Sequence, residues 1–247
     1  IIKSNNQNII KAANILKNGK LVSFPTETVY GLGAIANNDL AVANIFLAKK
    51  RPTFNPLIAH FYSSEDVFSH VKKNKIAEIL AENFWPGPLT MILYRKDKTN
   101  ISLLASAGNN SLGVRVPSKQ IALKLIKLCE CPIVAPSANL SGKISPTEAK
   151  HVEKYLSKEC EFILDGGNSN YGLESTVIDC RNDIPIILRH GPITKEMIND
   201  KLKLKEDNDF ILKTNSKNKK TSKGKLLSPG LLESHYAPNT PLRINAK

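Results

Sequence analysis

Hydrophobic residues recur at two spacings along the chain, and the alternation of these spacings predicts an α/β protein. Spacings of three and four residues, typical of one buried helix face, predict helices near residues 9–19, 40–48, 76–84, 119–128, 147–157 and 194–202. Short apolar runs predict strands near residues 21–24, 57–61, 89–94, 112–116, 132–135, 162–164, 175–178 and 184–188. Because helices and strands interleave without strict βαβ order, we expect a mixed, twisted open sheet flanked by helices.

This pattern fades towards the C-terminus. From residue 203 to about residue 225 the hydrophobic positions disappear, apart from residues 210–212, and rigid or aromatic residues return at 228–230 and 235–238. We therefore expect one folded domain over residues 1–205, followed by a lysine-rich linker and lid segment over residues 206–247. The returning residues predict that the end of this segment docks back on the body.

Charge indicates an anionic partner. The net charge is +13, which favours binding of a nucleotide, RNA or both. Roughly half of the excess lies in residues 201–225, where nine lysines face three acidic residues. A solvated linker is the simpler interpretation of this run, and an RNA-binding arm is the alternative.

The cysteines and the apolar runs indicate the compartment. The four cysteines have apolar neighbours and form neither a CxxC pair nor a zinc spacing, so we expect small core residues in a reducing environment. No apolar run reaches transmembrane length, and no signal peptide precedes the first strand. We expect a cytoplasmic protein without a membrane partner.

A cluster of polar groups follows the first predicted strand. Thr26, Glu27, Thr28 and Tyr30 come within five residues, and two glycines follow at once. Polar side chains at the end of a strand are typical of a small-ligand pocket in an open α/β sheet. The alternative is an ordinary polar turn.

Arginines in rigid or apolar surroundings are the next candidates. Pro52 and Pro56 stiffen the loop that carries Arg51 and Asn55, so these side chains would be held ready for a phosphate. Arg115 lies inside an apolar strand, where an unpaired charge is expensive. A bound anion and a structural salt bridge both remain open for Arg115.

A second polar cluster begins at Ser137. Ser145 is placed to cap the helix that follows, with Glu148 at the third helical position, and helix N-termini bind phosphate. The stretch 141–145 resembles the end of a P-loop, but Ser137 stands where the upstream glycine is required and Ile144 where a Ser or Thr is required. No nucleophile–base pair is apparent among the five scattered histidines.

Eight motifs in order make the sequence resemble the YrdC-type threonylcarbamoyl-AMP synthase family. The resemblance spans roughly residues 5–205 and continues into the tail at 228–242. The motifs are PTETVYGL at 25–32, KKRP at 49–52, NPLI at 55–58, WPGPLT at 85–90, RVP at 115–117, PSANLSG at 136–142, ESTV at 174–177 and RHG at 189–191.

The resemblance implies an activity and a set of site residues. The family condenses L-threonine, bicarbonate and ATP into L-threonylcarbamoyl-adenylate and pyrophosphate, for threonylcarbamoyladenosine modification of tRNA. The implied L-threonine-binding residues are Thr28, His60, Arg115, Ala135 and Ser175. The implied ATP-binding residues are Arg51, Asn55, Ser111, Ser137, Ser145, Arg189 and Tyr236. Lys49 and Arg51 would stabilise charge during catalysis, no acid–base pair and no protein metal site are assigned, and Mg2+ would arrive with ATP.

The chain also departs from the longer branch of that family. It stops at Lys247, where that branch continues into a second, Rossmann-like domain. The implied partners are downstream tRNA-modification proteins, with weak RNA binding as an additional expectation from the charge. Two alternatives stay open at this point: a non-catalytic RNA-binding module and a carbamoyltransferase-type domain. Threonine-dependent release of pyrophosphate from ATP separates them.

Overall fold

Ten strands form one mixed sheet in the computed structural model, which describes residues 1–203, 226, 228 and 229. The strands are β1 (Ile2–Lys3), β2 (Val22–Pro25), β3 (Tyr30–Ile35), β4 (Ile58–His60), β5 (Leu89–Tyr94), β6 (Ser111–Arg115), β7 (Ile133–Val134), β8 (Phe162–Asp165), β9 (Thr176–Asp179) and β10 (Ile186–Arg189). The helices are α1 (Asn6–Lys17), α2 (Asp39–Lys49), α3 (Ser64–His70), α4 (Lys75–Phe84), α5 (Gln120–Cys129), α6 (Ala149–Leu156) and α7 (Lys195–Leu202).

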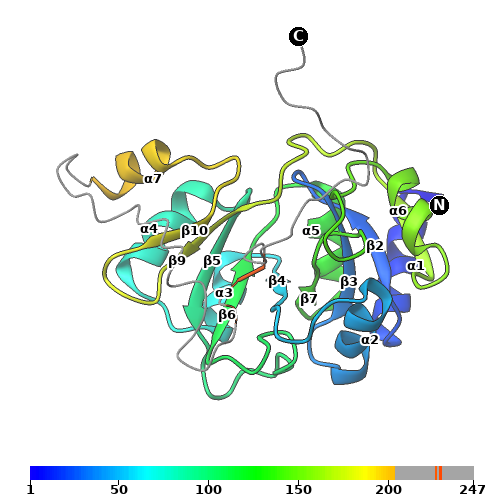
Figure 1. The fold of residues 1–247 in the computed structure, drawn as a ribbon, viewed down its shortest axis with the longest axis horizontal. Coiled ribbons are helices and arrows are strands. Elements are labelled where there is room, and N and C mark those ends of the chain that lie inside the picture. Colours follow the sequence, from blue (N-terminus) through cyan, green and yellow to red (C-terminus); the bar gives the residue numbers. More distant parts are fainter. Residues whose placement is uncertain (204–225, 227, 230–247) are drawn as a thin grey trace, which may run out of the picture.

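The sheet has the order β1-β8-β2-β3-β7-β4-β6-β5-β9-β10, and Figure 1 shows its two ends on either side of β4 and β7. Strands β4 and β6 run parallel, as do β5 and β9, whereas β7 is antiparallel to both of its neighbours. The predicted fold class, a mixed sheet flanked by helices, is therefore confirmed. The parallel pairing of β4 with β6 sets His60 beside Arg115.

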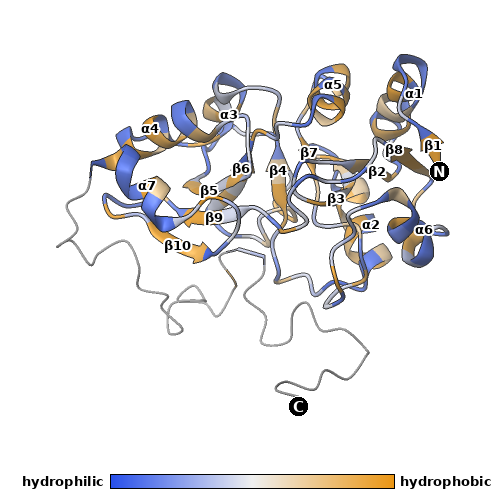
Figure 2. Cartoon of the chain, turned by 90° about the horizontal axis from the view of Figure 1, so that it is seen from above, coloured by the Kyte–Doolittle hydropathy of each residue, from blue (hydrophilic) through white to orange (hydrophobic). Residues whose placement is uncertain are grey.

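Helices cover both faces of this sheet. In the view of Figure 2, α1, α3, α4 and α5 line one face, and α2 and α6 lie across the other. Each helix buries one stripe: α4 buries Ala77, Leu80, Ala81 and Phe84, and its other positions are more exposed. Side-chain caps start most of these helices, as where Asn74 accepts a hydrogen bond from the Ala77 amide at 2.9 Å.

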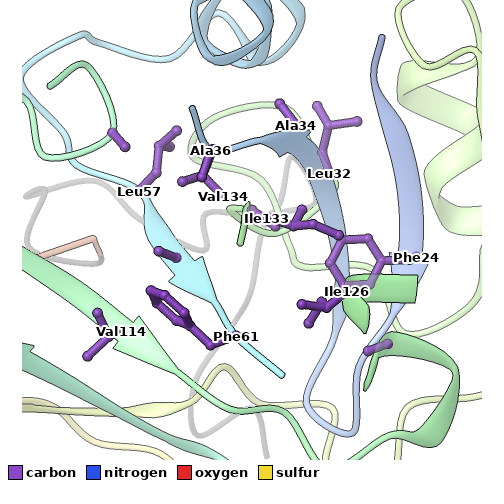
Figure 3. Packing of buried hydrophobic residues seen from close by; sticks show 14 of the residues in the cluster. Phe24, Leu32, Ala34, Ala36, Leu57, Phe61, Val114, Ile126, Ile133 and Val134 are labelled. Atoms are coloured by element: carbon purple, nitrogen blue, oxygen red, sulfur yellow. The ribbon is translucent and has the colours of Figure 1, made fainter. Parts of the chain in front are cut away.

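The core lies between the sheet and the helices. Figure 3 shows Phe24 of β2 beside Ile133 of β7 and Ile126 of α5, while Phe61 and Val114 fill the space near β4 and β6. All five side chains are buried. This packing fixes the positions of the strand ends that carry the polar residues discussed below.

Strand β3 was not predicted, because its glycines were interpreted as part of a loop. The loop contains only the four residues between β2 and β3, and the two strands form an antiparallel hairpin with Val22 opposite Gly33. A Cβ on Gly33 would lie 2.8 Å from both the Phe24 ring and Ile133, so glycine serves close packing there. The sequence prediction also lacked β1 and α3.

The predicted capping role of Ser145 is wrong. Helix α6 begins at Ala149, its N-cap is Glu148, and no side chain caps it. The Ser145 hydroxyl is engaged elsewhere, donating to Glu174 Oε1 at 2.7 Å.

The predicted linker and most of the predicted lid, including Tyr236, lie outside the described residues. Cys129, Cys160 and Cys180 are buried and Cys131 is partly buried, as expected for core cysteines. No helix within the described ranges has both the length and the apolar character needed to cross a membrane.

Candidate functional site

The loop between β2 and β3 supplies the first side of a pocket. Thr26 closes this loop on itself: its hydroxyl donates to the Val29 carbonyl at 2.7 Å and lies 2.8 Å from the Thr28 hydroxyl. Thr26 and Thr28 both line the pocket. Glu27, between them, turns away and points towards Arg115.

Arg115, at the end of β6, forms a buried ion pair with Glu27. Its guanidinium also donates to Thr28 Oγ1 at 3.0 Å and to the Gly87 carbonyl at 3.2 Å, and it lines the pocket. Burial alone would raise the pKa of Glu27, but the charge and hydrogen bonds of Arg115 hold it below its ordinary value of 4.5. The structural salt bridge that the sequence left open is therefore present, and Arg115 also faces the pocket.

His60 is a neutral polar group in this pocket. Burial, with the adjacent Arg115 charge, lowers the pKa of His60 to about 3. Its Nδ1 lies 3.2 Å from the Ile58 carbonyl, and its ring meets Phe24 edge to face at 6.3 Å. Since a carbonyl oxygen only accepts, the single N–H of the uncharged imidazole lies on Nδ1, and His60 adds no second positive charge to the pocket at neutral pH.

Arg51 is fixed by the loop that follows α2. Lys50 adopts a left-handed conformation with φ of 51°, which ends the helix and directs the chain into this loop. The Arg51 guanidinium then donates to the Asn55 carbonyl at 3.0 Å, to Asn55 Oδ1 at 2.7 Å and to the Pro56 carbonyl at 2.7 Å. The expected rigid presentation of Arg51 is observed, and Arg51 lines the pocket.

Lys49 lies behind the pocket rather than in its lining. Its ammonium donates to the Ser137 carbonyl at 2.5 Å and to the Asn139 carbonyl, and only 1% of the residue is exposed. Burial, with the nearby Arg51 charge, lowers the pKa of Lys49 to about 7. In this arrangement Lys49 holds the loop that presents Ser137.

Glu174 and Arg189 form the far wall. They make a second buried ion pair, and both line the pocket with Ser175. Arg189 also donates to the Ser175 carbonyl at 3.0 Å. Sequence reasoning assigned no role to Glu27 or Glu174, although each lies inside a quoted motif and a buried arginine requires such a partner.

Of the three described residues of the tail, one lines the pocket and the other two pack against the domain. The Leu226 carbonyl accepts a hydrogen bond from Asn109 Nδ2 at 3.0 Å, Ser228 is buried, and Pro229 lines the pocket.

The pocket encloses about 470 Å³, including space open to solvent. Of the predicted site residues, the pocket lining contains Thr28, Arg51, His60, Arg115, Ala135, Ser137, Ser175 and Arg189. Lys49, Asn55 and Ser145 lie outside the lining but contact residues that belong to it. Ser111 is also outside the lining, at the start of β6, the opposite end of the strand from Arg115. Three arginines converge on small hydroxyl groups and one neutral imidazole. This arrangement defines an α/β protein whose pocket is suited to small anionic ligands.

Comparisons with known proteins identify the family. Residues 14–191 match the family model Sua5/YciO/YrdC, which is described as "Telomere recombination". The chain is 42% identical to threonylcarbamoyl-AMP synthase of Bacillus subtilis, covering 98% of this chain and 68% of the relative. It is 44% identical to threonylcarbamoyl-AMP synthase of Pyrococcus abyssi, covering 94% and 66%.

A solved structure agrees with this assignment. The crystal structure of P. abyssi Sua5 complexed with L-threonine has a TM-score of 0.87 and 42% identity, covering 96% of this chain and 68% of that one. The chain belongs to the Sua5/YciO/YrdC family. It spans about two thirds of the length of these relatives.

Proposed function

We propose that the chain is an L-threonylcarbamoyladenylate synthase, which condenses L-threonine, bicarbonate or CO2, and ATP. The observation that carries the proposal is the meeting, around one pocket, of residues that the family resemblance relates to threonine with residues that it relates to ATP. Relatives named threonylcarbamoyl-AMP synthase, at 42% and 44% identity, support it.

Threonine would bind on the side formed by Thr28, His60, Arg115 and Ser175, here called the threonine side. Arg115 offers a fixed guanidinium for the amino-acid carboxylate, while Glu27 keeps that guanidinium in place. His60 and the hydroxyls of Thr28 and Ser175 supply uncharged hydrogen-bonding groups. The L-threonine complex of P. abyssi Sua5 supports an amino-acid site in this fold.

ATP would bind on the side formed by Arg51, Ser137, Ser145 and Arg189, here called the nucleotide side. Arg51 and Arg189 supply positive charge for the phosphates. Asn55 contacts Arg51 through its Oδ1, and its Nδ2 is buried and has no hydrogen-bond partner within the described structure. Buried polar atoms are normally paired, so Asn55 Nδ2 fits a site that takes a polar ligand. Ser111 Oγ, at the start of β6, is likewise buried and without a partner among the described residues.

The proposed reaction depends more on aligning the two substrates and excluding water than on an acid–base pair. The threonine nitrogen attacks the carbon of CO2 and loses a proton, forming a carbamate. A carbamate oxygen then attacks the α-phosphorus of ATP, and the bond to pyrophosphate breaks. Because carbamates decompose rapidly in water, the pocket would have to exclude water while this intermediate is present. Arg51, Arg115 and Arg189 bring the two anions together and stabilise the charge that develops between them.

Mg2+ would enter with the nucleotide. Within the described residues there is no group of three or more His, Cys, Asp or Glu side chains able to hold a metal ion, and Glu174 is the one carboxylate of the described pocket lining. This donor set does not fit a resident metal site.

The product would serve tRNA modification. A mixed carbamic–phosphoric anhydride is reactive, so it must pass to an enzyme that transfers the threonylcarbamoyl group to a tRNA adenosine. We propose downstream tRNA-modification proteins as the partners.

Release of pyrophosphate from ATP tests the proposed function. We expect release that requires both L-threonine and bicarbonate, with L-threonylcarbamoyl-adenylate detected by mass spectrometry. Pyrophosphate release at the same rate with and without L-threonine would contradict the proposal. Turnover of carbamoyl phosphate in place of threonine and bicarbonate would favour the carbamoyltransferase alternative instead.

A further inference from the structure

Glu174 connects several groups around the pocket. Its Oε1 accepts a hydrogen bond from Ser145 Oγ at 2.7 Å, and its Oε2 pairs with Arg189 Nη1. The Glu174 side chain is 11% exposed and that of Arg189 is 9% exposed. One carboxylate thus binds two side chains of the nucleotide side.

Arg189 extends this connection to the threonine side. Its Nε donates to the Ser175 carbonyl at 3.0 Å, and its Nη2 donates to Ser175 Oγ at 3.2 Å. Ser175 Oγ in turn lies 2.8 Å from Thr90 Oγ1 on β5. A continuous series of hydrogen bonds therefore runs from Ser145 through Glu174, Arg189 and Ser175 to Thr90. We call this series the Glu174–Arg189 bridge.

The backbone is shaped to hold the bridge together. A Cβ on Gly191 would lie 2.4 Å from the Thr176 nitrogen and 2.5 Å from the Glu174 carbonyl oxygen. Backbone atoms cannot yield as the end of a flexible side chain can, so only glycine allows the segment after β10 to lie this close to residues 174–176. Arg189 reaches both Glu174 and Ser175 because of this close approach.

We propose that Glu174 is a positioning residue that couples the two sides of the pocket. This inference rests on the proposed function. Glu174 orients Ser145 and Arg189 for the nucleotide, and through Arg189 it fixes Ser175 for threonine. A guanidinium has five N–H groups. The bridge engages three of them, so within the part of the chain that the structure describes two can turn to a phosphate oxygen while the bridge stays intact.

The coupling has a thermodynamic consequence. If both ligands require the same arrangement of the bridge, the first ligand to bind orders it, and the second binds to a site already ordered. Each ligand should therefore raise the affinity for the other by the same factor. The alternative is that the Glu174 carboxylate merely occupies the position of a phosphate. In that case removing its charge would strengthen nucleotide binding, whereas a positioning role predicts weaker binding.

Calorimetric titration of the Glu174→Gln variant tests the inference. L-threonine and a non-hydrolysable ATP analogue are titrated separately and then each in the presence of the other. For the wild type we expect at least fivefold mutual enhancement. For Glu174→Gln we expect at least tenfold weaker nucleotide binding, threonine binding alone within threefold of the wild type, and enhancement reduced to less than twofold.

Glu161→Gln is the matched control, since Glu161 is exposed and pairs only loosely with Lys20 at 3.8 Å. This variant should match the wild type in all four titrations. Tighter nucleotide binding by Glu174→Gln would overturn the inference, as would undiminished enhancement. A wild type that binds neither ligand would overturn the proposed function, and the inference with it, so the two failures can be told apart.

Two further variants keep the test decisive if Glu174→Gln does not fold. Glu174→Asp retains the charge but withdraws the carboxylate by one methylene, and it should lose most of the enhancement. Gly191→Ala alters no ligand-facing side chain, yet it should separate the segment after β10 from residues 174–176 and reduce the enhancement in the same way. Full enhancement in a folded Gly191→Ala protein would contradict the proposed coupling.

Discussion

Two of the four residues of the threonine side end neighbouring strands, whereas three of the four residues of the nucleotide side lie in loops. His60 and Arg115 end the paired strands β4 and β6, and the Glu27–Arg115 ion pair closes this side internally. Arg51 lies in the loop after α2, and Ser137 lies in a loop whose carbonyl is held by Lys49.

The difference indicates how each side meets its ligand. On the threonine side the buried charges are already paired, so the amino acid would find a preformed site. Beside Arg51 on the nucleotide side, Asn55 Nδ2 is buried and has no hydrogen-bond partner among the residues that the structure describes, so a ligand would complete this side. The Glu174–Arg189 bridge connects the preformed threonine side with the nucleotide side.

The largest effect is expected from Arg115→Ala. The substitution leaves the Glu27 carboxylate buried without its cation, which should lower the free energy of unfolding by about 3–5 kcal/mol. Urea denaturation measures this loss, and threonine binding should disappear. The Glu27→Gln/Arg115→Ala double variant should recover part of the stability but no threonine binding. A double variant no more stable than Arg115→Ala would show that the buried carboxylate is not the cause.

Arg51→Ala addresses the nucleotide side. Removing one of the three fixed positive charges, those of Arg51, Arg115 and Arg189, should reduce kcat/KM for ATP by about 10²-fold or more. The fold should persist, because the Arg51 guanidinium is hydrogen-bonded to Asn55 and Pro56 of the loop that carries it. Steady-state pyrophosphate release and a thermal melt check both points. If Arg51→Ala turns over as fast as the wild type, Arg51 does not stabilise the charge that develops in the reaction.

Gly33→Ala probes the packing beneath the threonine side. The new methyl group would lie 2.8 Å from Phe24 and Ile133, an overpacking that should lower stability by about 1–3 kcal/mol. Because the strain falls on the β2–β3 hairpin, threonine binding should weaken more than nucleotide binding. Equal weakening of both would mean that the hairpin does not support one side selectively.

The smallest effect is expected from His60→Gln and concerns pH. The pKa of His60 is about 3 in the folded protein, compared with an ordinary value of 6.5. Between these values the unfolded chain binds a proton that the folded chain does not, so stability falls as pH falls below 6.5. One such group contributes at most about 1.4 kcal/mol per pH unit.

Unfolding measured between pH 6.5 and 4.5 should show a shallower slope in His60→Gln than in the wild type. Below this window the carboxyl of Glu27, whose pKa is also lowered, adds its own loss. His70 has a lowered pKa as well, but it contributes equally to both proteins. Identical slopes would mean that His60 accepts a proton in the folded state.

Much of the fold and of the pocket could be predicted from the sequence. Helix and strand periods predicted the mixed sheet, and motif order predicted the family. Strand β3 was missed because glycine occurs both in turns and where strands pack closely. Only the Phe24 and Ile133 atoms next to Gly33 show that it has the second role here. Ser145 was misplaced as a cap because its acceptor, Glu174, lies 29 residues away in sequence. Long-range polar contacts of this kind leave no local signal.

A crystal structure with L-threonine and a non-hydrolysable ATP analogue tests the central claim most directly. The account predicts both ligands in the one pocket, with the threonine carboxylate on Arg115 and the phosphates beside Arg51 and Arg189. Ligands bound at separate places, or Arg115 turned towards bulk solvent, would contradict it.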